Sequence, residues 1–523
     1  MDFSTCVLGI ELGSTRIKGV LIDDNHEVIA SGSYGWENSL VDGVWTYELA
    51  DAVKGVQACF ADLKQDAEKK FGQPLKRVAA IGISGMMHGY LVFDKDGQQI
   101  APFRTWRNTI TGPAAAELTE LFRFNIPQRW SIAHLYQAIL NKEAHVKDIG
   151  RLTTLSGYIH YLLTGAFVTG IDEASGMFPY DAEISDFDAK RVAQFDALVA
   201  PYDFPWKLKK ILPAVLPAGA CAGCLTEEGA KLLDISGTLE AGIPLCPPEG
   251  DAGTGMVATG AVHPRTGSIS AGTSGFSLQV LERPLKGFYP QIDVCCTPAG
   301  KTVAMAHCNN CTSDIDAWVG LMADTARVLG CEVDKNELYG RLFRAALEGD
   351  ADCGGIVSFN YLAGEHLTET EVGRPMVVRL PDSKMTAANF MRAQLNAAVS
   401  TLCLGMQMLR DKEQVESDML LGHGGFFKTP GVGQQILANA LNVPISVMET
   451  AGEGGPWGMA LLAAYMVRKA DGETMEDYLS NKVFASAKSI TVEPDPEGVA
   501  GFRKYLERYK TALAAEKAAG AVN

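Results

Sequence analysis

The sequence predicts an α/β protein of two domains, each built around a mixed β-sheet with helices beside it. At 523 residues the chain exceeds what one hydrophobic core supports. Residues 7–22 and 268–281 share one plan: an apolar run, a turn of Gly, Ser and Thr, and then alternating apolar residues. Each segment predicts two strands joined by a tight turn. Gly13 and Gly272, in the two turns, lie about half the chain apart, which indicates one such hairpin in each domain.

The first domain is expected to open with three strands, at Cys6–Leu12, Ile17–Asp23 and Val28–Tyr34. Apolar residues at helical spacing then predict a helix at about Glu48–Phe71, and a further strand follows at Arg77–Ser84. Three strands, a helix and a strand do not follow the strict alternation of a dinucleotide-binding fold. The order favours a mixed sheet whose hairpin faces the ligand.

The chain from about 113 to 239 is predicted to be mostly helical, as an insertion that elaborates the first domain. After a predicted strand at Ile243–Cys246, the segment Pro247–Gly255 combines prolines, which end strands, with glycines, which allow sharp turns. We therefore expect a first domain at residues 1–258 and a second domain at residues 259–523.

The second domain is expected to continue with helices and strands that alternate around glycine loops. The predicted helices are at about 313–328, 335–347, 386–411, 432–441, from 456 onward, and at 496–519, and the predicted strands are at 418–421 and 445–448. Pro456 suits the start of its helix, because a proline there loses no hydrogen bond.

Composition and charge exclude several classes of function. Hydrophobic residues make up 47% and charged residues 21% of the chain, which is typical of a folded globular protein. The net charge of −16 argues against a nucleic-acid surface, because phosphate backbones are bound through clustered Lys and Arg. We see no signal peptide and no apolar run long enough to span a bilayer, so we expect a cytoplasmic protein without a membrane partner.

The twelve cysteines include two pairs with C-x-x-C spacing, Cys221 with Cys224 and Cys308 with Cys311. This spacing raises the alternative of a zinc site. The two pairs lie far apart in the sequence, without the compact layout of a zinc ribbon. Others, such as Cys246, lie in apolar stretches, where a free cysteine is a small core residue. We therefore expect neither structural zinc nor disulfides.

Hydroxyl and backbone N–H groups at the tips of the two hairpins indicate an anionic ligand. Turns of this kind form concave nests that bind phosphate. The alternative is two ordinary hairpins, since Gly-Ser-Thr turns are common. Their duplication at matching places favours the phosphate interpretation.

Four further motifs accompany the hairpins. They are Ser84–Gly89 (Ser-Gly-Met-Met-His-Gly), Phe103–Asn108 (Phe-Arg-Thr-Trp-Arg-Asn), Pro247–Gly253 (Pro-Pro-Glu-Gly-Asp-Ala-Gly) and Gly422–Gly425 (Gly-His-Gly-Gly). Together these features resemble the FGGY carbohydrate kinase family, within the actin-like ATPase superfamily, over nearly the whole chain. The pentulose kinases of ribulokinase and xylulokinase type are the most similar branch. The resemblance implies two ribonuclease-H-like domains with a cleft between them, sugar mainly on the first and ATP mainly on the second.

For the sugar site, the resemblance implies that Asp251 is the general base, since a carboxylate can take the proton of an attacking hydroxyl. The alternative is an Asp that caps the helix beginning at Ala252. Met87 would pack on the carbon face of the sugar, and His88 would bind its hydroxyls. Two further substrate contacts are expected in the second motif, at Trp106 and Asn108.

Two of these positions depart from the xylulokinase pattern. Met86 stands where xylulokinases have Gln, and Asn108 replaces the usual Asp with an uncharged amide. We interpret both departures as a sign of a different hydroxyl pattern in the substrate, and they favour L-ribulose over D-xylulose.

For the nucleotide, the resemblance implies Mg²⁺ and ATP. Glu11 stands where the family has an Asp that helps to hold Mg²⁺, usually through water, and Glu keeps the charge. The expected nucleotide-binding residues are Ser14, Thr15 and Arg16 in the first turn, Gly272, Thr273 and Ser274 in the second turn, Gly424 and Gly425 at the adenosine, and Lys428. Lys428 has the alternative of a solvated surface lysine. The loop Gly452–Gly455 is interpreted as a hinge rather than a contact.

The favoured function is ATP-dependent phosphorylation of a small ketose, L-ribulose or another pentulose, at its terminal hydroxyl. The alternatives are a D-xylulose kinase, an actin-like ATPase that uses nucleotide as a conformational switch, and a sugar-binding regulator without catalysis. The partners expected are therefore a small sugar and ATP, with a homodimer left open. A switch protein would not need Met87, His88 or Asp251, and Asp251 argues against the regulator.

Overall fold

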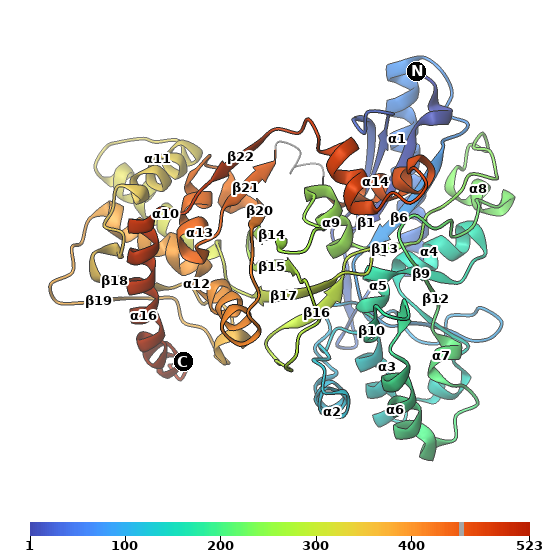
Figure 1. Cartoon of the computed structure of the whole chain (residues 1–523), viewed down its shortest axis with the longest axis horizontal. Coiled ribbons are helices and arrows are strands. Elements are labelled where there is room, and N and C mark those ends of the chain that lie inside the picture. Colours follow the sequence, from blue (N-terminus) through green and yellow to red (C-terminus); the bar gives the residue numbers. More distant parts are fainter. Residues whose placement is uncertain (449–453, 523) are drawn as a thin grey trace. The chain divides into compact units, whose positions relative to one another are not determined.

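The computed structural model describes residues 1–448 and 454–522, which form two compact units (Figure 1). Unit 1 comprises Met1–Val262, Asp293–Val303 and Glu453–Ser486, and unit 2 comprises His263–Ile292, Ala304–Gly452 and Ala487–Asn523. Two segments from the second half of the sequence thus belong to unit 1. Of the hinge predicted at 452–455, the first two residues lie outside the described residues.

Unit 1 combines a central sheet with many short elements. Its strands are β1 (Val7–Leu12), β2 (Arg16–Ile22), β3 (Val28–Gly35), β4 (Ser39–Val41), β5 (Val44–Thr46), β6 (Ala80–Gly85), β7 (Leu91–Phe93), β8 (Arg151–Thr153), β9 (Val168–Gly170), β10 (Tyr180–Asp181), β11 (Asp186–Phe187), β12 (Ala214–Leu216), β13 (Glu249–Gly250) and β16 (Asp293–Cys296). Its helices are α1 (Leu49–Phe71), α2 (Gly112–Phe122), α3 (Ser131–Leu140), α4 (Leu155–Thr164), α5 (Ile171–Ser175), α6 (Ala189–Val199), α7 (Leu208–Ile211), α8 (Glu227–Leu233), α9 (Asp251–Thr259), α14 (Gly454–Arg468) and α15 (Met475–Tyr478).

The central sheet of unit 1 is mixed, in the order β13-β6-β1-β2-β3. β13, β6 and β1 are parallel, whereas β1, β2 and β3 are antiparallel. Helices α1 and α14 cover opposite faces. A Cβ on Gly9 would lie 2.6 Å from the backbone nitrogen of Ala460 in α14, and a Cβ on Gly19 would lie 3.2 Å from Cys59 in α1. Gly19 pairs with Ile10, the neighbour of Gly9, and neighbouring residues of a strand point to opposite faces.

Unit 2 contains a second mixed sheet with longer helices. Its strands are β14 (Thr266–Ala271), β15 (Gly275–Val280), β17 (Thr302–Cys308), β18 (Ile356–Phe359), β19 (Met376–Arg379), β20 (Met419–His423), β21 (Ile445–Met448) and β22 (Ser489–Val492), and its helices are α10 (Ser313–Val328), α11 (Lys335–Leu347), α12 (Ala387–Glu413), α13 (Val432–Leu441) and α16 (Pro496–Ala519). From β17 the sheet runs β17-β15-β14-β20-β21-β22. β14 and β15 form an antiparallel hairpin, while β14, β20 and β21 are parallel.

Both predicted hairpins are confirmed, with the turns where the Gly, Ser and Thr residues lie. The strand predicted at Ile243–Cys246 is wrong: Pro244 and Leu245 form only isolated bridges. The predicted helical insertion contains helices α2 to α8, with short two-stranded sheets between them.

The described residues contain no helix that is long and apolar enough to cross a membrane. The twelve cysteines are all present as free thiols. Cys308 and Cys311 are buried, whereas Cys221 and Cys224 are exposed.

Candidate functional site

Three loops of unit 1 leave the same edge of its sheet. β1, β6 and β13 are parallel neighbours, so their carboxyl ends meet at one edge, where ligands bind in open α/β sheets. The segments that follow these strands carry the first turn (Ser14–Arg16), the pair Met87 and His88, and Asp251. The fold thus brings together residues from both ends of the first predicted domain.

Asp251 is the first residue of α9, and the N-cap of this helix is Gly250, without a side-chain cap bond. The Oδ1 atom of Asp251 instead accepts a hydrogen bond from the backbone N–H of Met87 at 3.3 Å. The residue is exposed, yet desolvation by the surrounding protein raises the pKa of its carboxyl, against backbone N–H groups that lower it. A reachable carboxylate of raised basicity has the properties of a general base.

Asp172 on α5 holds the segment around Asp251, and the sequence analysis missed it. Its side chain is buried, and its Oδ2 accepts hydrogen bonds from the backbone N–H groups of Gly250 at 3.1 Å and Gly253 at 3.0 Å. One oxygen therefore fixes the backbone on both sides of Asp251. Burial raises the pKa of Asp172 to about 7, and the charge of Asp251 adds to the effect.

Two more buried carboxyl groups, Glu173 and Glu249, lie behind Asp251. Glu249 accepts a hydrogen bond from the backbone N–H of Glu173 at 3.2 Å, while both carboxyl oxygens of Glu173 and one of Glu249 find no hydrogen-bond partner among the described residues. Burial, together with nearby negative charge, raises the pKa of both groups well above the ordinary value. Both groups are therefore harder to ionise than an ordinary glutamate.

Glu11, near the end of β1, has a carboxyl group packed tightly against the start of α14. Its Oε2 has no hydrogen-bond partner within the described part of the chain, and it would lie 1.5 Å from a Cβ on Gly455. Gly455 is therefore in direct contact with Glu11, and the hinge expected at 452–455 stays a prediction. Burial raises the pKa of Glu11 to about 8, and the charge of Asp251 contributes.

The carbonyl oxygens of the first turn are bonded to the body of unit 1. The indole of Trp36 donates to Gly13 at 2.7 Å, its backbone N–H donates to Thr15 at 3.2 Å, and the hydroxyl of Tyr47 donates to Ser14 at 2.5 Å. A carbonyl oxygen repels an anion. Because these carbonyl groups point into the protein, the N–H and hydroxyl groups of the turn are left to meet a phosphate.

Two more predicted residues lie beside the first turn. The indole of Trp106, 40% exposed, donates to the hydroxyl of Ser14 at 3.1 Å. Arg16 is exposed, and its guanidinium donates to the hydroxyl of Ser33 at 3.4 Å. Trp106 thus links the predicted sugar and phosphate regions of unit 1.

His88 has both ring nitrogens bonded to protein. Nδ1 lies 3.0 Å from the carbonyl oxygen of Gly176, and Nε2 accepts a hydrogen bond from Nε of Arg129 at 3.1 Å. This arrangement requires a neutral ring with its proton on Nδ1. Burial, with the charge of Arg129, lowers the pKa of His88 to about 3, in agreement with that state. Arg129 in turn forms an ion pair with Asp293.

The expected sugar contacts Met87 and Asn108 are both buried. Asn108 uses its amide on the backbone: Oδ1 accepts from Trp45 at 2.8 Å, and Nδ2 donates to the carbonyl groups of Trp45 and Thr105. Met86, the other departure from the xylulokinase pattern, is 1% exposed. The two positions that favoured L-ribulose therefore lie in the packed interior of unit 1.

The second turn, in unit 2, is built like the first. The carbonyl oxygen of Gly272 accepts from the backbone N–H of Thr312 at 2.9 Å and from its hydroxyl at 2.7 Å. The carbonyl of Thr273 accepts from Cys311 at 3.1 Å, and that of Ser274 accepts from Gly272 at 3.0 Å. Both turns thus present the same kind of surface to an anion.

The predicted adenosine loop lies next to the second turn. β14 and β20 are parallel, so the segments that follow them leave the same edge of the sheet. Gly424 has a φ of 103°, and a Cβ there would lie 2.6 Å from the carbonyl oxygen of Ala271, so glycine alone fits. A Cβ on Gly425 would meet nothing within 4 Å, and Lys428 is exposed nearby.

Each unit, taken by itself, offers groups that suit part of a magnesium nucleotide. Two turns with their carbonyl groups tied back offer N–H and hydroxyl groups to phosphates, and the glycine loop leaves open space beside the second turn. The unpartnered Glu11 oxygen, close to the charge of Asp251, fits a cation. Mg²⁺ retains several waters and needs only one or two carboxylates, so the lack of any three-residue ligand cluster among the described residues is compatible with it.

Two family descriptions match most of the chain. The N-terminal domain of the "FGGY family of carbohydrate kinases" matches residues 6–257, and the C-terminal domain of the same family matches residues 267–467.

Similar proteins agree with this match. A xylulose kinase from Haemophilus influenzae is 22% identical over 97% of this chain and 99% of its own length. Solved structures of a "xyloylose kinase" from Brucella ovis and a xylulose kinase from Rhodospirillum rubrum each give a TM-score of 0.79 at 20% identity, with 98% of this chain covered and 99% and 98% of theirs. They confirm the predicted two-domain, actin-like ATPase fold. The chain therefore belongs to the FGGY family of carbohydrate kinases.

Proposed function

We propose that this enzyme phosphorylates a pentulose at its terminal hydroxyl, with Mg²⁺ and ATP, and with Asp251 as the general base. The observation that carries the proposal is the arrangement at the edge of the unit 1 sheet. There an exposed carboxylate of raised pKa follows β13, held from behind by Asp172 and bonded to the backbone of Met87. The sugar is assigned to unit 1 and the nucleotide to unit 2.

In the proposed reaction the sugar hydroxyl attacks the γ-phosphorus of ATP. Its proton passes to the carboxylate of Asp251 as the new O–P bond forms, and the bond from phosphorus to the β-phosphate oxygen breaks, which releases ADP. Mg²⁺, when bound, neutralises phosphate charge, and Glu11 is the residue proposed to hold it through water. Asp172 keeps Asp251 in place throughout.

His88 and Met87 are proposed to shape the sugar pocket. His88 is bonded at both nitrogens, so its task in this proposal is to orient Arg129, whose guanidinium lies between His88 and Asp293. Met87 supplies an apolar surface next to the catalytic carboxylate. Trp106, half exposed beside Ser14, is the proposed contact at the phosphate side of the pocket.

On unit 2, the second turn and the glycine loop are proposed to bind the nucleotide, and on unit 1 the first turn is proposed as a phosphate-binding element. Ser14, Thr15 and Arg16, with Gly272, Thr273 and Ser274, would contact phosphates, while Gly424 and Gly425 would lie against the adenosine. Lys428 is exposed and within the same loop region, which suits a contact with phosphate or ribose.

Two pentuloses are candidates for the substrate, L-ribulose and D-xylulose. Met86 and Asn108, which favoured L-ribulose, are interior residues, and the similar proteins are named xylulose kinases. D-Xylulose is thus an equal candidate, and one altered hydrogen bond can decide between them. A screen of ADP release against ketopentoses, ketohexoses, glycerol and gluconate tests the proposal. A higher kcat/KM for a ketopentose than for every other class is expected, and a clear preference for another class would reject the pentulose assignment.

A further inference from the structure

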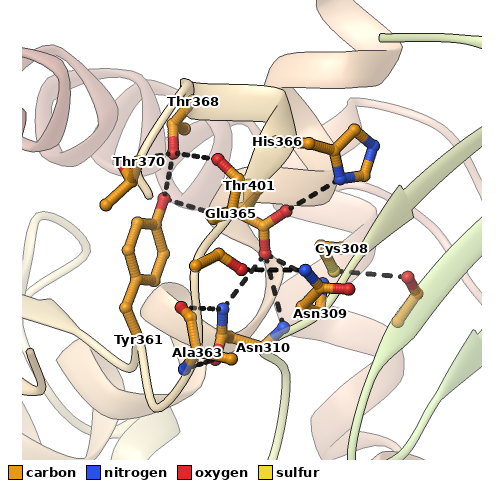
Figure 2. A network of polar contacts seen from close by, with 12 residues as sticks. Cys308, Asn309, Asn310, Tyr361, Ala363, Glu365, His366, Thr368, Thr370 and Thr401 are labelled. Atoms are coloured by element: carbon orange, nitrogen blue, oxygen red, sulfur yellow. Dashed lines mark hydrogen bonds and ion pairs between the residues drawn. The ribbon is translucent and has the colours of Figure 1, made fainter. Parts of the chain in front are cut away.

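A buried carboxyl group lies in unit 2 beside the support of the second turn, and the proposed reaction does not use it. Glu365 belongs to the loop that joins β18 to β19, and its side chain is 0% exposed (Figure 2). Its Oε2 accepts three hydrogen bonds: from the backbone N–H groups of Asn309 at 2.9 Å and Asn310 at 3.4 Å, and from the side-chain amide of Asn310 at 3.2 Å. A buried charge is expensive unless it is bonded in this way.

The side chain of Asn310 in turn binds the loop that contains Glu365. Its Oδ1 accepts from the backbone N–H groups of Leu362 and Ala363, both at 2.9 Å, and its Nδ2 donates to the carbonyl of Ala363 at 3.0 Å as well as to Glu365. Each polar atom of this amide therefore has a partner in the loop. Figure 2 shows Glu365 and Asn310 facing each other at the centre of the network.

The loop itself is anchored in the core of unit 2. Glu365 and Thr370 exchange backbone hydrogen bonds at 2.7 and 2.9 Å. Next to them, the hydroxyl of Tyr361 is bonded to those of Thr368 and Thr401. These hydrogen bonds tie the loop to the body of unit 2 and restrict the motion of the residues that they join.

The segment that Glu365 binds, Asn309–Asn310, leads directly into the residues that support the second turn. Immediately after Asn310, Cys311 donates to the carbonyl of Thr273, and Thr312 donates twice to that of Gly272. Asn360, the first residue of the loop, donates from its side-chain amide to the carbonyl of Cys311 at 2.7 Å. Glu365 is thus connected to the carbonyl groups of the turn through its hydrogen bonds to Asn310, the backbone from Asn310 to Thr312, and the hydrogen bonds of Cys311 and Thr312.

We propose that Glu365 is a positioning residue for nucleotide binding: through Asn310 it fixes the segment that holds the carbonyl groups of Gly272 and Thr273 away from the phosphates. The inference rests on the proposed function, in which this turn binds ATP. Without the carboxylate, three N–H groups lose their acceptor, the segment shifts, and the turn presents carbonyl oxygens to an anion.

The two oxygens of Glu365 predict different results for different substitutions. Oε2 accepts the hydrogen bonds from Asn309 and Asn310. Oε1 accepts no hydrogen bond among the described residues and lies 3.5 Å from Nδ1 of His366. Gln can place its amide oxygen at the Oε2 position, with its NH₂ toward His366, so Glu365→Gln retains the acceptor. Glu365→Ala removes it.

The test is calorimetric binding of ADP and of adenosine to the purified full-length chain. We expect Glu365→Ala to weaken ADP binding about 10-fold or more, with adenosine binding much less affected, and Glu365→Gln to restore most of the loss. Glu369→Ala is the matched control, because Glu369 is an exposed residue of the same loop. If Glu365→Ala proves unfolded, Thr312→Val probes the far end of this connection and is expected to weaken ADP binding selectively.

The outcomes separate the two proposals. If the natural chain does not bind ADP, the proposed function fails. If it binds ADP but Glu365→Ala and Thr312→Val leave the affinity unchanged, or weaken ADP and adenosine equally, the positioning role of Glu365 is overturned and the proposed function stands.

Discussion

The first and second turns both have their carbonyl groups hydrogen-bonded to the protein, but different kinds of side chain hold the two turns in place. In unit 1, two aromatic side chains, Trp36 and Tyr47, bond the turn, and their rings stack with centroids 4.2 Å apart. In unit 2, Cys311 and Thr312 do so, in a segment bonded to the buried carboxylate of Glu365. The same kind of turn can therefore be built on aromatic packing or on a buried polar network, and only the second depends on a buried carboxyl oxygen as acceptor.

The surroundings of the two turns differ as well. Near the first turn lie Asp251, Glu11 and a group of buried carboxyl groups with unpartnered oxygens. Near the second lie the glycines of the adenosine loop. In the proposed function, the carboxyl groups of unit 1 serve acid–base chemistry at the reacting hydroxyl, and the glycines of unit 2 leave space for the nucleotide.

The largest expected effect is at Asp251. Asp251→Asn retains the shape and an acceptor for the Met87 N–H but cannot take a proton, so kcat should fall by about 10²–10⁴-fold. Sugar KM and the melting temperature should change little. Steady-state kinetics beside a thermal melt measure this, and near-normal kcat would remove Asp251 from the mechanism.

The next largest effect is expected at Asp172, which holds the backbone on both sides of Asp251. Asp172→Ala leaves the N–H groups of Gly250 and Gly253 without their acceptor, at a cost of about 1–3 kcal/mol for a buried group. We expect a lower unfolding free energy in urea and a lower kcat. Unchanged stability with normal kcat would show that Asp172 does not hold the segment around Asp251.

A smaller pair of changes compares the two turns directly. Tyr47→Phe removes the donor to Ser14, and Thr312→Val removes one of two donors to Gly272. A single hydrogen bond contributes about 0.5–1.5 kcal/mol, so each should raise the KM for ATP about 2–10-fold, with the larger rise for Tyr47→Phe. A rise in sugar KM alone would contradict the assignment of both turns to phosphate.

The last prediction concerns the dependence of stability, rather than of turnover, on Glu11 and pH. Its pKa is about 8 in the folded chain against an ordinary 4.5, so the folded state binds the extra proton between these values. The contribution of Glu11 to the free energy of unfolding is therefore complete below pH 4.5 and is lost as the pH rises toward 8. Glu11→Gln should therefore melt higher than the natural chain at pH 8 and close to it at pH 5. Equal melting differences at both pH values would argue against a raised pKa.

Local patterns predicted much of the fold. The helices at 313–328, 335–347, 432–441 and 496–519 follow apolar spacing and lie where expected, and both hairpins follow from their turns. The strand expected at Ile243–Cys246 failed because apolar residues do not specify a pairing partner. The assignment of residues 293–303 to unit 1 depends on contacts far apart in sequence, which periodicity does not contain.

In the candidate site too, some residues could be predicted from local sequence patterns and others could not. Asp251, Met87 and the first turn follow strands of the unit 1 sheet, so their shared edge follows from the order of elements. The second turn follows a strand of the separate sheet of unit 2. Asp172 and Glu365 act through bonds to distant backbone groups, and a single acidic residue gives no sign of such partners. Asn108 looked like a ligand in its motif, whereas its amide is used by Trp45 and Thr105.

The most direct test of the account is the rate of ADP formation by the purified chain with Mg²⁺ and ATP, measured with and without a ketopentose. The account predicts that D-xylulose or L-ribulose raises the rate well above the sugar-free rate, and that removal of Mg²⁺ abolishes the increase. An ATP turnover that no ketopentose stimulates would contradict the account and favour an actin-like ATPase that uses its nucleotide as a conformational switch.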